Sequence, residues 1–236
     1  MKNFKLQTGD GNDLSRKQII GVIVVIVFVA YFSIKFTNSP YHNSNEVKEI
    51  ATSVAPTPKP IDPAVLETYK KQLADLKTKF DYKYDEFEKK GWYTAKSQSA
   101  ESTSYKTLLR AFVNNSGYIY LASQYHGDDW IFHTKATVKI GDTVYTTEDI
   151  PSYDSNNERT NSTGGVWEEI SFIGGKDNGI LKAIAESGDL PIKVRLSGDQ
   201  DLKDFTLSQK DQQAIKDAYQ LSDLIKKVGD TGIPQS

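Results

Sequence analysis

The clearest feature of the hydropathy pattern is an uncharged apolar run that begins at Ile19 and ends at Ile34, with basic residues on both sides. A helix that crosses a bilayer needs about 20 apolar residues, within a workable range of about 17–25. Phe36 and the aliphatic stem of Lys35 extend the run to a workable span. We therefore expect a transmembrane anchor over residues 19–36. The alternative is a cleaved signal peptide, but the residues after the run offer a poor small-x-small cleavage site.

The basic residues that flank this run predict its orientation. Two follow it within 20 residues, whereas four precede it: Lys2, Lys5, Arg16 and Lys17. Because positive charge favours the cytoplasmic side, we expect residues 1–18 in the cytoplasm and the rest of the chain outside. Residues 37–61 are polar and contain four prolines, which favours an extended spacer over a helix.

A helical period follows the spacer. Asp62 and Pro63 provide a capping side chain and a proline at the first helical position. The pattern predicts an amphipathic helix over residues 62–90, ending before Gly91. Its apolar stripe repeats every seven residues, at Leu66, Leu73, Phe80 and Phe87. Two interpretations stay open: the stripe packs on the following domain, or it mediates a weak self-association of the protein.

From Gly91 onward the period changes to two, which is typical of half-buried strands. We expect strands over residues 106–113, 118–125, 130–140, 143–147, 166–173, 190–196 and 203–207. Helices are expected at 178–186 and 208–228, with a Ser208–Asp211 capping box and Gly229 just past the end. The predicted fold class is therefore α+β: a mainly antiparallel, β-sandwich-like domain over 91–228 with flanking helices, followed by a tail over 229–236.

Composition removes several classes of function. A formal net charge of −2 for the whole chain, and −5 for residues 37–236, gives no general attraction to nucleic acid. Because cysteine is absent, there is no disulfide, thiolate metal site, cysteine nucleophile or lipidated cysteine. No nucleophile elbow, phosphate-binding glycine loop or dinucleotide motif is present. With three histidines in all, serine–histidine catalysis has almost no candidates.

Potential ligands are densest around Asp128 and Asp129, which His126 and His133 flank. A transition metal is one interpretation. A structural turn between two strands is the favoured one, because Gly and Asp are ordinary turn residues and His133 is expected on the polar face of its strand. Residues 152–163 are expected to be a solvated loop, and residues 97–104 another loop. We expect no cofactor and no metal.

Trp167 and Glu168 are the second candidate binding group, because an aromatic ring beside a carboxylate suits a sugar or a cationic peptide. Glu168 and Glu169 point to opposite faces of a strand, so they cannot act as a catalytic pair with each other. Pairing of Glu168 with Asp129 stays open. The candidate binding residues are therefore Asp128, Asp129, Trp167 and Glu168.

Four motifs carry a resemblance across about residues 80–227. They are DEFE (85–88) with GWY (91–93), YHGDDWIF (125–132), GGVWEE (164–169), and a closing helix after FTLS (205–208). In this order they resemble a module of uncharacterised bacterial envelope proteins, in which a membrane anchor or lipid attachment precedes a small β-rich domain. The resemblance implies a location and a fold, and it implies no activity.

The sequence therefore predicts a single-pass envelope protein whose outward domain binds an envelope protein or glycan, or supports an assembly, without being an enzyme. One alternative is a carboxylate-dependent hydrolase of envelope polymer. The other is a scaffold that self-associates through the 62–90 helix.

Overall fold

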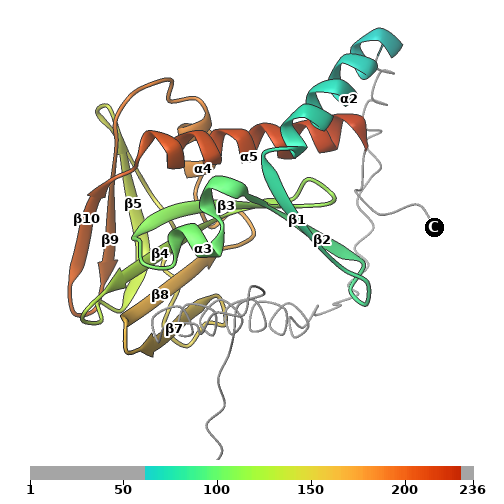
Figure 1. Ribbon diagram of the computed structural model, residues 1–236. Coiled ribbons are helices and arrows are strands. Elements are labelled where there is room, and N and C mark those ends of the chain that lie inside the picture. The colour runs from blue at the N-terminus through green and yellow to red at the C-terminus, as the bar shows by residue number, and fades with distance from the viewer. Residues whose placement is uncertain (1–61, 230–236) are drawn as a thin grey trace, which may run out of the picture. The chain divides into compact units, whose positions relative to one another are not determined.

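The computed structural model of the protein describes residues 62–229 (Figure 1). The predicted segments 1–18, 19–36 and 37–61 lie outside these residues, as does the tail from residue 230. Residues 63–229 belong to one compact unit.

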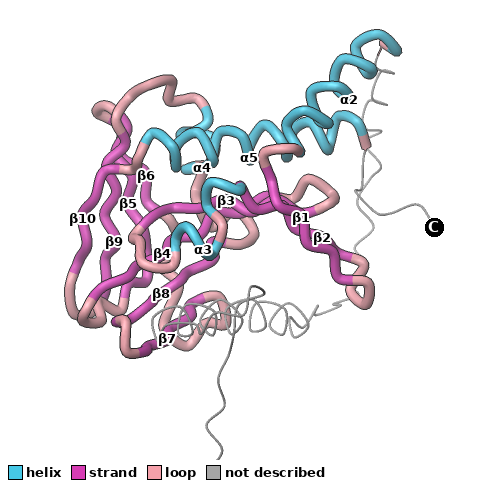
Figure 2. Tube along the Cα trace, viewed as in Figure 1, coloured by secondary structure: helices cyan, strands magenta, loops and turns pink. Residues whose placement is uncertain are grey.

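Helices and strands are interleaved along this unit (Figure 2). The helical elements are α2 (Pro63–Lys77), the 3₁₀ turn η1 (Lys96–Gln98), α3 (Ala100–Thr103), α4 (Ile180–Ala185) and α5 (Gln209–Val228). The strands are β1 (Phe80–Asp85), β2 (Lys90–Ala95), β3 (Leu108–Asn114), β4 (Ile119–Gly127), β5 (His133–Ile140), β6 (Thr143–Thr146), β7 (Asn157–Ser162), β8 (Gly165–Phe172), β9 (Ile192–Gly198) and β10 (Leu202–Thr206).

The strands form two antiparallel sheets. The larger sheet has the order β1-β2-β3-β4-β8-β7 and curls strongly, and the smaller one has the order β10-β9-β5-β6 (Figure 1). Every pairing of neighbouring strands is antiparallel. The predicted α+β class with mainly antiparallel strands is confirmed. The connections within β1–β2, β3–β4, β5–β6, β7–β8 and β9–β10 are short, which favours antiparallel hairpins over parallel crossovers.

Helix α5 packs on β3 and also contacts α2 and α4 (Figure 1). Its apolar stripe is buried, with Ile215, Ala218 and Leu221 fully enclosed. The predicted ends are confirmed: the Ser208 side chain accepts a hydrogen bond from the backbone N–H of Asp211, and Gly229 has the left-handed φ of 70°. The sequence therefore places this helix correctly because both its stripe and its caps are local signals.

The predicted helix over residues 62–90 is wrong in its second half. Helix α2 ends at Lys77, and the chain then forms the β1–β2 hairpin. The residues of β1 alternate aromatic and charged side chains, a period of two that a heptad count overlooks. Asp85 closes the hairpin turn, because its carboxylate accepts from the backbone N–H groups of Phe87 and Glu88 at 2.9 and 3.0 Å.

Aromatic contacts across the hairpin explain why the strand conformation prevails. The rings of Tyr82 and Tyr93 lie 4.4 Å apart between centroids, and Phe80 meets Tyr93 edge-on at 6.5 Å. Tyr82 also covers Gly91, where a Cβ atom would lie 2.0 Å from the tyrosine hydroxyl oxygen. Cross-strand aromatic pairs of this kind stabilise sheets, and a helix cannot form them.

The heptad stripe therefore does not exist as a helix face. Leu73 and Phe80 are buried in the core, Leu66 is half-buried, and Phe87 is 99% exposed at the hairpin turn. Leu66 and Leu73 lie in α2, Phe80 begins β1 and Phe87 lies in the hairpin turn, so the four residues do not form one continuous apolar stripe.

Two predicted loops contain secondary structure. Residues 97–104 include α3 and the end of η1, and residues 152–163 include β7, which pairs with β8 at the edge of the larger sheet. The sequence does not predict β7 because its residues are all polar and show no alternation of apolar and polar side chains. An edge strand with a solvated face does not need such alternation.

Strand β5 starts three residues later than predicted. An irregularity between His133 and Lys135 shifts the register, so the side chains before it change faces. The prediction that His133 lies on the polar face is therefore wrong: Ile131 and His133 are buried, and Trp130 is half-buried. Phe132 adopts a left-handed φ of 53° at this point.

Candidate functional site

The four predicted binding residues do not come together on one surface. Asp128 and Asp129 are exposed in the turn between β4 and β5, as the structural-turn interpretation predicts. Trp167 and Glu168 are neighbours in β8, with exposed fractions of 2% and 0%. Because strand neighbours point to opposite faces, the indole and the carboxylate lie on different sides of the larger sheet.

Trp167 is a core residue. Its indole N–H donates to the backbone carbonyl of Ser104. The rings of Tyr105 and His126 pack against it at centroid distances of 5.8 and 4.8 Å. A buried indole with its one donor satisfied stabilises the fold and has no polar atom left for a ligand.

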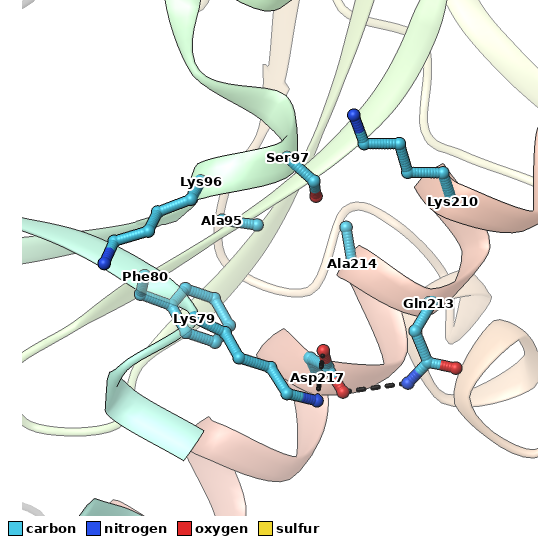
Figure 3. Close-up of a pocket in the computed structure, with 9 residues that line it drawn as sticks. All are labelled: Lys79, Phe80, Ala95, Lys96, Ser97, Lys210, Gln213, Ala214 and Asp217. Carbon is cyan, nitrogen blue, oxygen red and sulfur yellow. Dashed lines mark hydrogen bonds and ion pairs between the residues drawn. The ribbon is translucent and has the colours of Figure 1, made fainter. Parts of the chain in front are cut away.

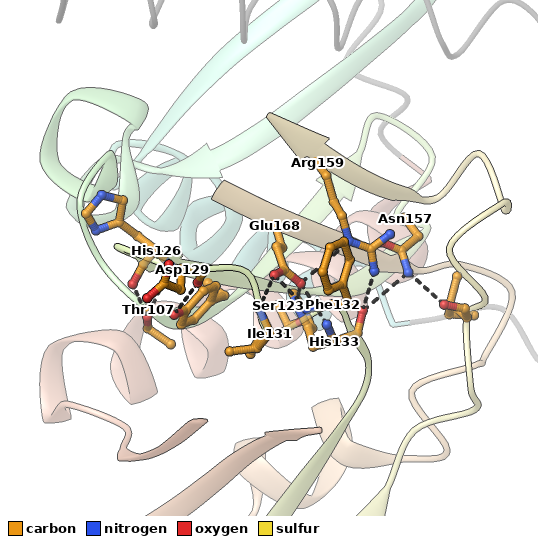
Figure 4. Close-up of polar contacts among 12 residues, drawn as sticks. Thr107, Ser123, His126, Asp129, Ile131, Phe132, His133, Asn157, Arg159 and Glu168 are labelled. Carbon is orange, nitrogen blue, oxygen red and sulfur yellow. Dashed lines mark hydrogen bonds and ion pairs between the residues drawn. The ribbon is translucent and has the colours of Figure 1, made fainter. Parts of the chain in front are cut away.

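Glu168 is the centre of a buried polar cluster, which we call the Glu168 cluster (Figure 4). One oxygen, Oε1, accepts from the backbone N–H groups of Ile131 and Phe132, each at 2.8 Å. The other, Oε2, accepts from the backbone N–H and the ring Nδ1 of His133, at 2.7 and 2.9 Å. Four hydrogen-bond donors thus surround a carboxylate that is fully removed from solvent.

His133 continues this cluster to Ser123. Its Nε2 lies 3.0 Å from the Ser123 hydroxyl. Because the carboxylate oxygens of Glu168 only accept, Nδ1 of His133 carries the ring hydrogen, and the unprotonated Nε2 accepts from the Ser123 hydroxyl. The order serine, histidine, glutamate matches that of a hydrolytic triad.

Access decides against catalysis by these three groups. Ser123, His133 and Glu168 are each 0% exposed. A nucleophile must meet its substrate within about 3–3.5 Å, and here protein atoms occupy that space. The arrangement therefore has the hydrogen bonds of a triad without an opening for a substrate.

The protonation states follow from burial and hydrogen bonding. Burial lowers the pKa of the His133 imidazole, and the nearby Arg159 charge acts in the same direction against the raising effect of Glu168. Burial by itself would raise the pKa of the Glu168 carboxyl, but the hydrogen bonds from His133 and Phe132 outweigh it and the pKa lies below its usual value. The cluster is therefore a neutral imidazole beside an ionised carboxylate.

The Glu168 cluster joins the two sheets. Glu168 lies in β8 of the larger sheet, whereas His133 begins β5 of the smaller one. From β7, the guanidinium of Arg159 and the amide of Asn157 donate to the backbone carbonyl of His133, at 3.1 and 3.4 Å. Arg159 also lies 3.7 Å from Glu168 Oε2 and compensates its charge.

The bend at residues 131–133 is held from its other side by β9. A Cβ atom on Gly198 would lie 2.0 Å from the carbonyl oxygen of Ile131 and 2.7 Å from the backbone nitrogen of His133. Only glycine allows this approach of two backbones. The bend is therefore held between Glu168 and Gly198, which explains the left-handed conformation of Phe132.

A second buried pair lies on the opposite face of the larger sheet. Glu169 and Arg110 form an ion pair with exposed fractions of 6% for each residue. The prediction that Glu168 and Glu169 point to opposite faces is thus confirmed, because their partners lie on different sides of β8.

Unlike the buried Glu168 cluster, a second candidate site is open to solvent. It is a pocket of about 400 Å³ where the β1–β2 hairpin and η1 meet α5 (Figure 3). We call it the hairpin pocket. Phe80, Ala95 and Ala214 are among its apolar lining residues, and Lys79, Lys96 and Lys210 are its basic ones. None of the four predicted binding residues lines it.

Within residues 62–229, no three or more acidic or histidine side chains are arranged to hold a metal ion. No helix in this range is both long and apolar enough to cross a bilayer.

The fold and its sites define an α+β protein with two antiparallel sheets, a sealed polar cluster between them and an open basic pocket. No family model, curated protein or solved structure matches the chain. The resemblance to an envelope module stays a prediction.

Sequence reasoning missed the pairing of Ser123 and His133 and the whole hairpin pocket. His133 was expected on the polar face, and the register shift in β5 turned it inward. The pocket joins residues 79–97 to residues 210–217, which a reading along the chain does not bring together. The aromatic alternation of β1 was the one local signal that could have revealed the hairpin lining this pocket.

Proposed function

We propose that the protein is a single-pass envelope protein with a cytoplasmic N-terminus, whose outward sandwich-like domain binds a ligand or supports an assembly without catalysing a reaction. The anchor proposed at residues 19–36 and the spacer at 37–61 rest on the sequence, since both lie outside the described residues. The proline-containing spacer separates the domain from the bilayer, which suits a domain that meets a partner away from the membrane.

One observation carries the preference for binding over catalysis. The group with the hydrogen bonds of a triad is sealed, with Ser123, His133 and Glu168 each 0% exposed, whereas the hairpin pocket is open and lined by lysines on an apolar floor. An open apolar pocket with a few polar groups is the usual form of a binding site. The two acidic candidates that remain exposed, Asp128 and Asp129, lie in a turn.

A carboxylate-dependent hydrolase is the less favoured alternative. Such chemistry needs two carboxyl groups on one accessible cleft, about 5–10 Å apart. Glu168 is buried and fully hydrogen-bonded, and Glu169 is paired with Arg110 on the other face of the sheet. No observation on the described residues favours this reaction class.

Protease protection on membrane vesicles tests the location. The full chain carries an epitope at each end, and we expect the C-terminal epitope to be digested from the outer side only. Retention of the N-terminal epitope in the membrane fraction on a chain of full mass, 26.4 kDa plus the two epitopes, supports an uncleaved anchor. Digestion of the C-terminal domain from the cytoplasmic side would overturn the proposal.

A matched variant controls for the topology signal. Arg16→Glu with Lys17→Glu removes two of the four preceding basic residues and reverses two charges. Because the flanking Lys and Arg residues set orientation, this double variant is expected to invert a measurable fraction of molecules. If the double variant has the same orientation as the wild-type protein, the result contradicts an anchor at this position.

A further inference from the structure

We propose that the hairpin pocket binds an anionic group, a carboxylate or a phosphate, that is attached to a small apolar body. This inference rests on the proposed binding function and names the chemical class of its ligand.

The size of the pocket sets the first limit. Its volume of about 400 Å³ lies at the lower end of the range of about 300–1,000 Å³ in which proteins bind small molecules. The side chain of Phe80 and the methyl groups of Ala95 and Ala214 form an apolar lining (Figure 3). These three side chains are only 4–5% exposed, so the hydrophobic gain comes mainly from the ligand's own apolar surface leaving water against them, and part of the ligand is therefore apolar.

The charge of the lining sets the second limit. Three lysines and one aspartate line the pocket, so its formal charge is +2. The described chain, residues 62–229, has 22 Lys and Arg against 26 Asp and Glu and is therefore negative. The pocket is thus a positive site on an acidic domain, and such a contrast in sign concentrates anions at the positive site.

The partners of the lysines show which charges are available. Asp217 compensates Lys79, at 3.0 Å, and also accepts from the amide of Gln213 at 2.8 Å (Figure 3). Lys96 donates to the backbone carbonyl of Thr78 at 2.9 Å, a neutral acceptor that leaves its charge uncompensated.

Lys210 differs from the other two lysines of the lining. Within residues 62–229 its ammonium has no hydrogen-bond or ion-pair partner, and its side chain is exposed on the first turn of α5. Lys96 and Lys210 therefore hold the two positive charges that an anion can neutralise. They come from η1 and α5, on different sides of the pocket (Figure 3).

Isothermal titration calorimetry tests the inference by measuring how small probe molecules bind to the purified full chain in detergent. The probes are phenyl phosphate, benzoate, benzyl alcohol and inorganic phosphate. We expect saturable binding of one or both aromatic anions and no saturation with benzyl alcohol, which lacks the charge. Whichever anion binds more tightly identifies the head group as phosphate or carboxylate. We expect inorganic phosphate to bind more weakly than phenyl phosphate, because it has no apolar surface of its own to bury in the pocket.

Matched variants locate the binding. Lys96→Gln and Lys210→Gln are each expected to weaken binding about two- to five-fold, the effect of losing one partly exposed charge pair. Lys203→Gln, at an exposed lysine of β10 outside the pocket, removes the same charge and is expected to leave the affinity unchanged. Raising the ionic strength to about 1 M, where the Debye length is about 3 Å, is expected to weaken binding of both aromatic anions.

Three results would overturn the inference: equal binding of benzyl alcohol and the anions, equal effects of Lys203→Gln and Lys210→Gln, or no saturable binding of either aromatic anion. These outcomes are independent of the vesicle assay. If anions bind but the domain is found in the cytoplasm, the proposed location fails alone. If the topology holds and no anion binds, the ligand class fails alone.

Discussion

At the scale of single residues, Glu168 shows how a charge is tolerated in a protein interior. An isolated ionised carboxylate costs a large free energy of desolvation when it is buried, and it would take up a proton. Here two backbone N–H groups bind one oxygen, and the backbone and ring N–H groups of His133 bind the other. Hydrogen bonds to the charged form lower the pKa and keep the group ionised.

Replacing this carboxylate is expected to be costly. Glu168→Gln leaves the shape of the side chain nearly unchanged. It replaces one carboxylate oxygen, which accepts hydrogen bonds in the wild-type protein, with an NH₂ group that faces other N–H donors. We expect a loss of about 3–5 kcal/mol in the free energy of unfolding, the range for breaking a buried charged pair. Urea unfolding of residues 62–236, followed by circular dichroism, measures it.

Glu186→Gln is the matched control for this change. The Glu186 side chain is 65% exposed at the C-cap of α4, beside Lys182. We expect a change within about 0.5 kcal/mol, as for most surface substitutions. If Glu168→Gln costs no more than Glu186→Gln, the cluster does not stabilise the fold.

The stability of the domain is expected to fall in acid because of His133. Its folded pKa lies below the usual 6.5, so below about pH 6.5 the unfolded chain binds a proton that the folded one does not. The free energy of unfolding therefore decreases as the pH falls from about 6.5, by at most about 1.4 kcal/mol per pH unit. Because the Glu168 carboxyl also has a lowered folded pKa, a further loss follows below its ordinary value of 4.5.

Urea unfolding of residues 62–236 at several pH values between 7 and 5 checks this prediction. His133→Gln keeps an N–H donor but does not titrate, so its unfolding free energy is expected to vary less over this range. A slope that is the same in both proteins would show that His133 is not the source of the acid sensitivity.

At the scale of elements, the β1–β2 hairpin shows how tertiary and cross-strand contacts override a helical pattern. The heptad spacing of Leu73, Phe80 and Phe87 is present in the sequence, yet Phe80 begins a strand and Phe87 occupies the turn. Pairing of Tyr82 with Tyr93 and the turn formed by Asp85 stabilise the hairpin locally. The helical stripe has no comparable set of contacts beyond Lys77.

Two phenylalanines distinguish the hairpin from the helix by experiment. Phe80 is 5% exposed and Phe87 is 99% exposed. We expect Phe80→Ala to cost about 3–5 kcal/mol of unfolding free energy, as for a buried phenylalanine, and Phe87→Ala to change it by less than about 0.5 kcal/mol. Urea unfolding of residues 62–236 measures both. A continuous helix with both rings on one packed face predicts similar losses, and that result would refute the hairpin.

At the scale of the whole molecule, the chemistry is divided between a closed interior and an open surface. The Glu168 cluster lies between the two sheets and fixes the bend at residues 131–133. The hairpin pocket lies at a different place, where β1–β2 and η1 meet α5. This division agrees with the proposal that ligand binding takes place at the hairpin pocket. It also explains why triad-like hydrogen bonds do not imply a hydrolase here.

The sequence by itself determined the elements whose signals are local. Alternating side chains placed most of the strands of both sheets, and the stripe and caps of α5 placed that helix from Ser208 to Gly229. Of the candidate site, it determined that Asp128 and Asp129 form a turn and that Glu168 and Glu169 face opposite ways. These features depend on neighbours within a few residues, which the sequence lists directly.

Only the tertiary structure decided which of these residues meet. The register shift in β5 turned His133 inward to Glu168, which is 35 positions away in the chain, and Ser123. The hairpin pocket arises from residues more than a hundred positions apart, such as Lys96 and Lys210. The physical reason is the same in both cases: burial and charge compensation depend on contacts across the fold, and periodicity along the chain contains no information about them.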